Sequence, residues 1–162
     1  MTRCTVTGET PENPDDAPTP TERTKADGQK ADHWVLCEEE RAKGFVRPVR
    51  DSYIHVGAPG PEFELRDLKD DERERFGGEF AKFEPYPEGH HGSATGKYWT
   101  QADINAIGKG CQVKTTMPRA IAETYARQPR YYGSTWCCGC RKYLPVGKDG
   151  EFVWGDGSRV GT

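Results

Sequence analysis

The sequence has few of the hydrophobic residues that build a large core. Only 33% of its 162 residues are hydrophobic, while 30% are charged. No stretch approaches the roughly 18 apolar residues that a membrane-spanning helix needs. The N-terminus also lacks the basic start and apolar segment of a secretory signal. We therefore expect a small protein in the cytoplasm, a reducing compartment where closely spaced cysteines bind metal or react more often than they form structural disulfides.

The sequence also lacks a complete catalytic signature. It contains no H-E-x-x-H, no G-x-S-x-G and no P-loop. Zinc deaminases combine P-C-x-x-C with an upstream H-x-E, but here no proline precedes Cys137 and no His-x-Glu occurs. These absences favour a protein that acts by binding. One alternative is an enzyme that uses the thiol of Cys138, with His55 as a possible partner, or an open position on a bound metal.

Composition divides the chain into an N-terminal tail and a compact part. Residues 1–32 contain four prolines among Thr, Glu and Asp, with almost no aliphatic side chains. Such a segment buries too little apolar surface to offset the entropy of ordering it. We predict a disordered acidic tail over residues 1–32 and a single compact domain over residues 33–162.

Charge is distributed unevenly along the sequence. Residues 93–162 carry ten basic and five acidic side chains, whereas residues 33–92 carry nine and fourteen. Nine of the seventeen aromatic residues also lie in residues 93–162. A basic and aromatic surface can follow a phosphate backbone and stack on bases, although aromatic residues also build cores that are poor in Leu and Ile. We expect a protein or nucleic acid partner to contact this portion, through residues such as Arg127, Arg130, Arg141 and Lys142.

Local patterns predict an α+β fold of short antiparallel strands and two or three short helices. Helices are expected at residues 68–76, 100–107 and 116–128, where acids in the first turn, a Thr100–Asp103 capping box and an early proline mark the starts. Extended segments are expected at residues 44–56, 111–115, 143–146, 151–154 and 159–160, with a hairpin turn at Gly155–Gly157. Residues 57–64 and 84–97 are expected to be loops, because glycine and proline are frequent there.

Three of the six cysteines lie within the stretch S-T-W-C-C-G-C-R-K-Y-L-P, residues 134–145. Cys137 and Cys140 have the C-x-x-C spacing that lets two thiolates hold one tetrahedral ion while backbone amides donate hydrogen bonds to the sulfurs. Gly139 is expected to relieve the tight turn. A thioredoxin-type redox motif would need a long helix starting at the cysteines, and Pro145 prevents one. The spacing therefore predicts half of a zinc site, with Cys138 pointing away as a small buried side chain.

Two further ligands must come from elsewhere in the chain. Cys111 is the best third ligand, because it precedes the helix that leads back to the C-x-x-C turn. We favour His55 as the fourth, since it ends a strand-like run between Ile54 and Val56. His33, Cys37, His90 and His91 are the other candidates. The predicted site is one zinc ion held by His55, Cys111, Cys137 and Cys140.

The C-x-x-C turn resembles the knuckles of zinc ribbons, treble clefs and rubredoxin-like sites over about ten residues. From Lys43 to Thr162, the segments K-G-F-V-R-P-V-R-D-S-Y-I-H-V-G, A-E-T-Y-A-R, W-C-C-G-C and E-F-V-W-G-D-G-S-R-V-G-T are similar to small proteins of bacteriophage and bacterial genomes with no established activity. The resemblance implies a phage or prophage origin and supplies no mechanism. The leading hypothesis is a zinc-stabilised module that acts by binding, and a structural or accessory phage protein is a further alternative.

Overall fold

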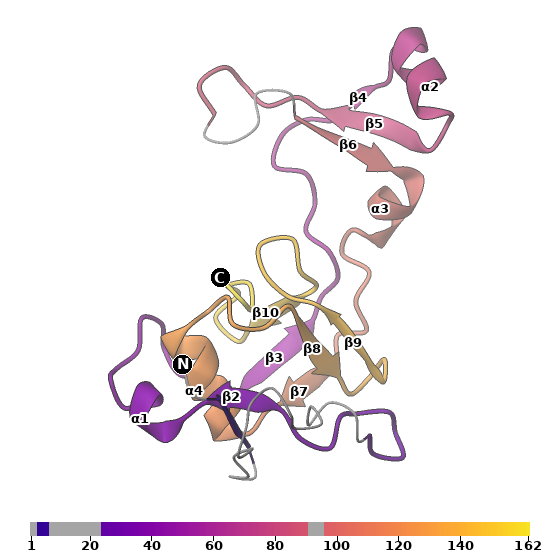
Figure 1. Ribbon diagram of the computed structural model, residues 1–162. Helices are drawn as coiled ribbons and strands as arrows, with labels where there is room; N and C mark the ends of the chain where they lie inside the picture. The colour runs from indigo at the N-terminus through magenta and orange to yellow at the C-terminus, as the bar shows by residue number, and fades with distance from the viewer. Residues whose placement is uncertain (1–2, 7–23, 91–95) are drawn as a thin grey trace. The chain divides into compact units, whose positions relative to one another are not determined.

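The computed structural model describes residues 3–6, 24–90 and 96–162, and it has the expected α+β character (Figure 1). The chain forms two compact units. Unit 1 comprises the chain up to Val56 together with Gly110–Thr162, and unit 2 comprises Gly57–Lys109. The part that we predicted as a single domain, residues 33–162, is thus divided between two compact units, because the middle of the chain makes its contacts mainly within itself. In the described residues, no helix has the length and apolar character to cross a membrane.

Unit 1 contains one three-stranded sheet and two two-stranded sheets, all antiparallel. In the first, β3 (Ser52–His55) lies between β10 (Phe152–Trp154) and β7 (Lys114–Thr116). The other two pair β8 (Ser134–Cys137) with β9 (Lys142–Pro145), and β1 (Arg3–Thr5) with β2 (Trp34–Leu36). The strands expected at 143–146 and 151–154 are thus present, and their ends differ from the expected ones by at most one residue. The broad run 44–56 is a strand only in its last part, beyond Pro48.

Two helices complete unit 1. Helix α4 (Arg119–Arg127) begins after Pro118, as expected, and buries Ile121, Ala122 and Tyr125. The short α1 (Glu38–Arg41) lies beside it (Figure 1). Two ion pairs join these helices, Arg41 with Glu123 at 3.2 Å and Arg127 with Glu40 at 3.3 Å. Charged side chains of α4 therefore bind a neighbouring helix.

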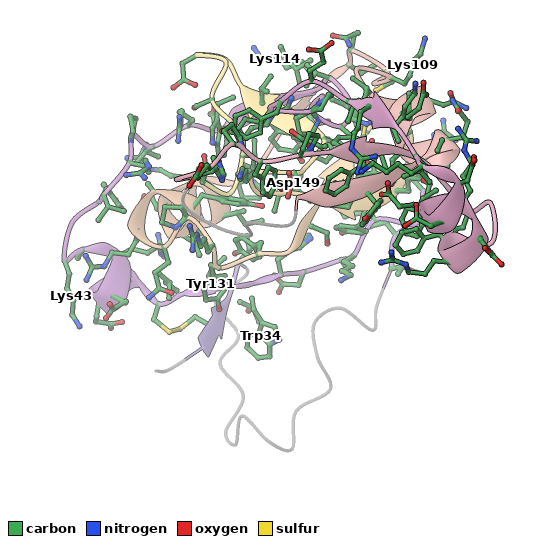
Figure 2. All side chains as sticks on the ribbon, turned by 90° about the horizontal axis from the view of Figure 1, so that it is seen from above. Trp34, Lys43, Lys109, Lys114, Tyr131 and Asp149 are labelled. Carbon is green, nitrogen blue, oxygen red and sulfur yellow. A yellow bond between two sulfur atoms is a disulfide. The ribbon has the colours of Figure 1, made fainter. Side chains whose placement is uncertain are left out.

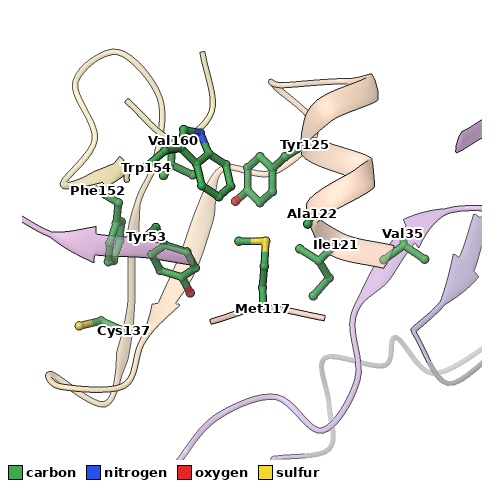
Figure 3. Close-up of a cluster of buried hydrophobic side chains, with 10 residues drawn as sticks. All are labelled: Val35, Tyr53, Met117, Ile121, Ala122, Tyr125, Cys137, Phe152, Trp154 and Val160. Atoms are coloured by element: carbon green, nitrogen blue, oxygen red, sulfur yellow. The ribbon is translucent and has the colours of Figure 1, made fainter. Parts of the chain in front are cut away.

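Four of the ten buried residues in the core of unit 1 are aromatic, in keeping with the composition (Figure 3). Tyr53 on β3 makes edge-to-face contacts with Phe152 and Trp154, at centroid distances of 5.2 and 6.2 Å. Tyr125 of α4 contacts Trp154 in the same way at 5.5 Å. Such pairs contribute about 0.5–1.5 kcal/mol beyond the area that they bury. A few large rings thus replace the aliphatic residues that the sequence lacks.

Part of the expected N-terminal tail is ordered, which corrects the prediction for residues 1–32. Residues 3–5 form β1 against β2, and the backbone N–H of Val6 donates to Asp32 at 3.0 Å. Cys4 also forms a disulfide with Cys37 (yellow bond in Figure 2). Composition missed this packing because a pairing between β1 and β2 spans about thirty residues of sequence and leaves no local pattern. The expected disorder of residues 7–23 lies outside the described residues.

The Cys4–Cys37 disulfide also bears on the expected compartment. Disulfides persist mainly in oxidising environments and are rare in reducing ones. The pair was therefore not expected from the sequence, which led us to predict a reducing compartment.

Unit 2 is a small sheet with two helices. Its strands are β4 (Arg66–Asp67), β5 (Phe80–Glu84) and β6 (Lys97–Thr100), in the order β4-β5-β6. The helices α2 (Asp70–Phe76) and α3 (Gln101–Ala106) agree with the prediction. The Thr100–Asp103 capping box is present, with bonds of 3.0 and 3.1 Å, and Gly77 ends α2 at φ +62°. The sequence did not predict β5 and β6, which lie on either side of the loop expected at 84–97.

Two buried carboxylates organise unit 2. Glu84 accepts from the backbone N–H of Phe63 at 2.7 Å and from the indole of Trp99 at 3.0 Å. Glu72 of α2 binds both terminal nitrogens of Arg66, at 2.8 and 3.2 Å, and so ties the helix to β4. Hydrogen bonding to Arg66 lowers the pKa of Glu72 to about 2. These contacts connect α2, β4, β5 and β6 within the unit.

Candidate metal centre

Four side chains from three separate parts of unit 1 come together at one place. They are His55 at the end of β3, Cys111 before β7, Cys137 at the end of β8 and Cys140 in the turn before β9. Their ligand atoms all lie within 4.8 Å of one another, close enough to hold a metal ion. This is the set that the sequence predicted.

His55 is fixed on the buried face of β3. Its side chain lies on the same face as Tyr53, two residues earlier, and packs against the ring of Phe152 at a centroid distance of 5.1 Å. Nδ1 faces the cluster, 3.4 Å from the sulfur of Cys140, while Nε2 lies 3.0 Å from a carboxylate oxygen of Glu151. A carboxylate on the far nitrogen fixes the tautomer and orientation of a metal-binding histidine. Glu151, which we did not predict, thus supports the site.

Cys111 is held beside His55 by backbone contacts. Its N–H donates to Nδ1 of His55 at 3.3 Å, and the next residue, Gln112, donates to the carbonyl of His55 at 2.9 Å. Gln112 has a left-handed backbone, with φ +62°. A Cβ on Gly110 would lie 2.1 Å from the carbonyl oxygen of His55, so a residue without a side chain is required there. The expected strand at 111–115 therefore starts only at Lys114, because residues 110–112 turn around His55.

The C-x-x-C turn has the hydrogen bonding expected of a metal knuckle. The N–H of Cys140 donates to the sulfur of Cys137 at 3.4 Å, and the N–H of Arg141 donates to the carbonyl of Cys137 at 2.8 Å. Arg141 takes the left-handed conformation that closes the turn, with φ +56°. Strand β9 then leads away, as predicted.

Gly139 has a different role from the one expected. Its backbone is not among those with positive φ. A Cβ at this position would instead lie 2.8 Å from the sulfur of Cys111 and 2.8 Å from Val113. Glycine is therefore needed so that the turn can approach the third ligand.

The spacing of the ligand atoms suits a tetrahedral ion. With zinc–sulfur bonds of about 2.3 Å and zinc–nitrogen bonds of about 2.0–2.1 Å, tetrahedral geometry places two sulfurs about 3.8 Å apart and sulfur and nitrogen about 3.5 Å apart. The sulfurs of Cys111 and Cys137 are 3.4 Å apart, and so are Nδ1 of His55 and the sulfur of Cys140. Small shifts within the cluster would bring all four atoms onto one ion.

The thiols of the cluster differ in acidity. Burial raises the pKa of Cys137 to about 11. For Cys111 burial also acts to raise the pKa, but hydrogen bonds from the Val113 backbone, His55 and the neighbouring cysteines outweigh it and lower the pKa to about 7. Protons are therefore shared unevenly among sulfurs in contact. A metal ion would replace those protons, because thiolates are the metal-binding form.

The other candidate ligands lie elsewhere. His33 contacts the hydroxyl of Tyr143 at 3.0 Å, and burial lowers its pKa. Cys37 is in the disulfide with Cys4. His90 stacks on Tyr86 in unit 2, with 4.8 Å between ring centroids. His91 lies outside the described residues.

Cys138 points away from the cluster but is exposed, whereas we expected it to be buried. Its sulfur accepts from the hydroxyl of Thr115 at 3.3 Å, and its N–H donates to the same hydroxyl at 3.1 Å. These bonds attach the knuckle to β7. Cys138 thus contacts Thr115 and the carbonyl of Lys114. The sulfur beside Nδ1 of His55 is that of Cys140, and not that of Cys138 as the enzyme alternative would require.

The predicted partner-binding residues fall into two places. Arg141 and Lys142 are exposed beside the knuckle, close in sequence to the metal cluster. Arg130 is exposed beyond α4, in a shallow basin that Arg47 and Tyr131 also line. Arg127 lines the same basin, but its guanidinium binds Glu40 and the carbonyl of Gly44. Arg127 is therefore engaged within unit 1.

No protein-family model, curated protein or solved structure matches this chain. The resemblance to small phage proteins stays a prediction.

Proposed function

We propose that this protein is a zinc-stabilised binding module, in which His55, Cys111, Cys137 and Cys140 hold one structural zinc ion. The observation that supports this proposal is the convergence of the four ligand atoms within 4.8 Å. Three thiolates and an imidazole select zinc over magnesium, calcium or manganese, which prefer oxygen ligands. Four protein ligands complete a tetrahedron and leave no open position for a substrate or a reactive water. The role of the ion is therefore structural.

The ion would link parts of unit 1 that are far apart along the chain. It joins β3, the segment before β7 and the β8–β9 hairpin, which are separated by tens of residues in the sequence. Metal binding to ligands that are not preorganised in the unfolded chain adds directly to the free energy of folding. With few aliphatic residues available, this contribution matters more than it would in a chain with a large core.

The binding role rests on charge near the metal cluster. Between Ile104 and Lys148 the sequence has eight basic residues and one acidic residue, Glu123. Lys114, Arg141 and Lys142 are exposed in this stretch, and none forms an ion pair within the described part of the chain. Free cations on a rigid turn suit an anionic partner, either nucleic acid or an acidic protein surface. We propose that such a partner binds here.

Metal analysis tests the zinc site. Protein purified without chelator should contain one equivalent of zinc, and Co²⁺ substitution should give the absorption of a tetrahedral thiolate-rich site. Cys137→Ser and Cys140→Ser should lower zinc content and thermal stability together. Cys138→Ser is the matched control, because it removes a neighbouring thiol that faces away, and it should retain the full equivalent. Wild-type protein without metal, or His55→Ala with a full equivalent of zinc, would contradict the assignment.

Salt dependence tests the partner. If nucleic acid binds at Lys114, Arg141 and Lys142, log K should fall with log salt with a slope of up to about −3 on duplex DNA, and each Lys or Arg→Ala change should reduce the slope by about 1. Arg119→Ala on α4 is the control, since Arg119 already pairs with Glu123 at 2.8 Å. Alkylation of Cys138 should leave capture of the partner intact. Salt-insensitive binding would remove nucleic acid from consideration, and a thiol-dependent activity lost on alkylation would favour the enzyme alternative.

A further inference from the structure

Unit 1 contains a second feature that the metal centre does not explain. A cavity of about 120 Å³ lies between the segment of residues 25–33 and the aromatic core. Its walls include the side chains of Tyr53 and Tyr125, with Met117 between them (Figure 3). The hydroxyl of Tyr125 points toward Met117 in this view.

The hydroxyl of Tyr125 is buried without a hydrogen-bond partner among the described residues. The residue is 3% exposed, and burial raises its pKa. Thr135 acts in the opposite direction on this pKa, and the hydroxyl of Thr135 donates to that of Tyr53 at 3.1 Å. Burying a hydroxyl without a partner is unfavourable, and a ligand that accepts its proton would remove this penalty.

Six flat rings are part of the cavity wall. Besides Tyr53 and Tyr125, the wall includes Tyr132, Trp136, Tyr143 and His33. Several of these rings are held by bonds to the protein through their polar ends: Tyr53 donates to the carbonyl of Trp136, Tyr132 to the carbonyl of Trp34 at 2.5 Å, and Tyr143 accepts from the N–H of Lys30 at 2.9 Å. Their faces and edges are therefore preset for another aromatic ring.

Charge at the cavity favours an anionic group. Lys25 and Lys30 both line it, and Lys30 lies over the ring of Tyr143 at 4.8 Å. The acidic lining residue, Asp32, already accepts from the backbone N–H groups of Val6 and His33, at 3.0 and 2.8 Å. These two bonds reduce the repulsion that its carboxylate would exert on an anion.

Size restricts the ligand to a single ring. An apolar cavity of about 150 Å³ is known to hold benzene, so about 120 Å³ matches one six-membered ring better than a fused pair. We propose that this cavity binds a small planar six-membered ring that carries a hydrogen-bond acceptor toward Tyr125 and an acidic group toward Lys25 and Lys30. A simple aromatic acid and a pyrimidine nucleotide share this chemistry. The cavity is distinct from the proposed metal centre and from the basic surface at the knuckle, because neither the four proposed ligands nor Lys114, Arg141 and Lys142 line it.

Binding to the intact, metal-loaded protein tests the proposal, with 4-hydroxybenzoate and uridine monophosphate as probes. Ligand-observed NMR should show saturable binding of at least one probe, with a Kd of about 0.1–1 mM as befits so small a ligand. Cyclohexanecarboxylate, which has the acid but not the flat ring, should bind at least about 10-fold more weakly. Tighter binding of the nucleotide would identify the nucleotide class, and selective binding of 4-hydroxybenzoate would identify the aromatic acid. If neither probe binds up to about 10 mM, the proposal is wrong and the cavity holds only water.

Tyr125→Phe separates a ligand role from a structural one. It removes only the hydroxyl, so it should weaken probe binding by about 3- to 10-fold. Because that hydroxyl has no partner in the free protein, the melting temperature should stay the same or rise. Tyr86→Phe, at a tyrosine of unit 2 that does not line the cavity, should change neither quantity. Unchanged probe affinity in Tyr125→Phe, or a melting temperature that falls with it, would overturn the proposal.

Discussion

The backbone N–H of Cys111 donates to Nδ1 of His55 at 3.3 Å, although the two residues are 56 positions apart in the sequence. Nearly all of the intervening chain, Gly57–Lys109, forms unit 2. Where the chain returns, a Cβ on Gly110 would lie within 2.5 Å of the carbonyl carbon of Val56. The ends of the insertion are thus in contact, and both lie next to proposed metal ligands.

Unit 2 should therefore be removable. Replacing residues 57–109 by a linker of about four Gly and Ser residues should leave unit 1 folded with its full metal content, because every proposed ligand lies outside the insertion. The stability of unit 1 should stay the same or rise, because a shorter connection has no larger closure entropy than the insertion. Zinc analysis and chemical denaturation of the shortened protein measure both effects. Loss of the metal would show that the centre depends on unit 2.

Gly139→Ala should weaken metal binding. The new methyl group would meet the sulfur of Cys111 and the side chain of Val113, both at 2.8 Å, and overpacking of this kind costs about 1–3 kcal/mol. We expect a loss of zinc affinity of about 10-fold or more in competition with a chromophoric chelator. Gly133→Ala is the matched control, since a Cβ there meets nothing within 4 Å. Equal affinity in the two variants would mean that the knuckle does not approach Cys111 as described.

Removal of the Cys4–Cys37 disulfide should lower stability and leave the metal in place. The bond closes a sequence separation of 33 residues, for which the loop-entropy relation gives about 3–4 kcal/mol. The Cys4→Ser, Cys37→Ser double variant should show this loss in denaturant and still bind one zinc. If its zinc content falls as well, Cys37 contributes to the metal site after all.

Deletion of residues 1–32 should lower the melting temperature further than the double variant does. The deletion removes β1 and exposes Val35 and Leu36, each now 1% exposed. Composition alone predicts almost no change for a tail of this kind. Thermal melts of the deletion and of the double variant, compared with the wild type, distinguish these expectations.

Glu72 should make unit 2 sensitive to acid. Hydrogen bonding to Arg66 lowers the pKa of Glu72 from 4.5 to about 2, so the stabilising pair is complete above pH 4.5 and is lost as the pH falls toward 2. Glu72→Gln should destabilise unit 2 at neutral pH and flatten its pH dependence in this range. Amide NMR signals of β5 and β6 measure the effect in unit 2 alone. Glu74→Gln, an exposed residue of the same helix, should keep the wild-type profile.

Several features could be predicted because their determinants are local in the sequence. The Thr100–Asp103 capping box, the glycine that ends α2 and the proline before α4 each act within one helical turn, and all three helices are present. The C-x-x-C spacing likewise places Cys137 and Cys140 on one tight turn, because two cysteines three positions apart lie on the same turn whatever surrounds them.

The remaining features depend on contacts between distant residues, and only the tertiary structure decided them. The sequence favoured His55 over His33, Cys37, His90 and His91 only because His55 ends a strand-like run. The pairing of β3 with β10 and β7 is what brings His55 to the cluster. The Cys4–Cys37 bond, the separation of unit 2 and the unpartnered hydroxyl of Tyr125 have the same origin. These features depend on how segments pack in three dimensions, and packing of this kind leaves no periodic pattern in the sequence.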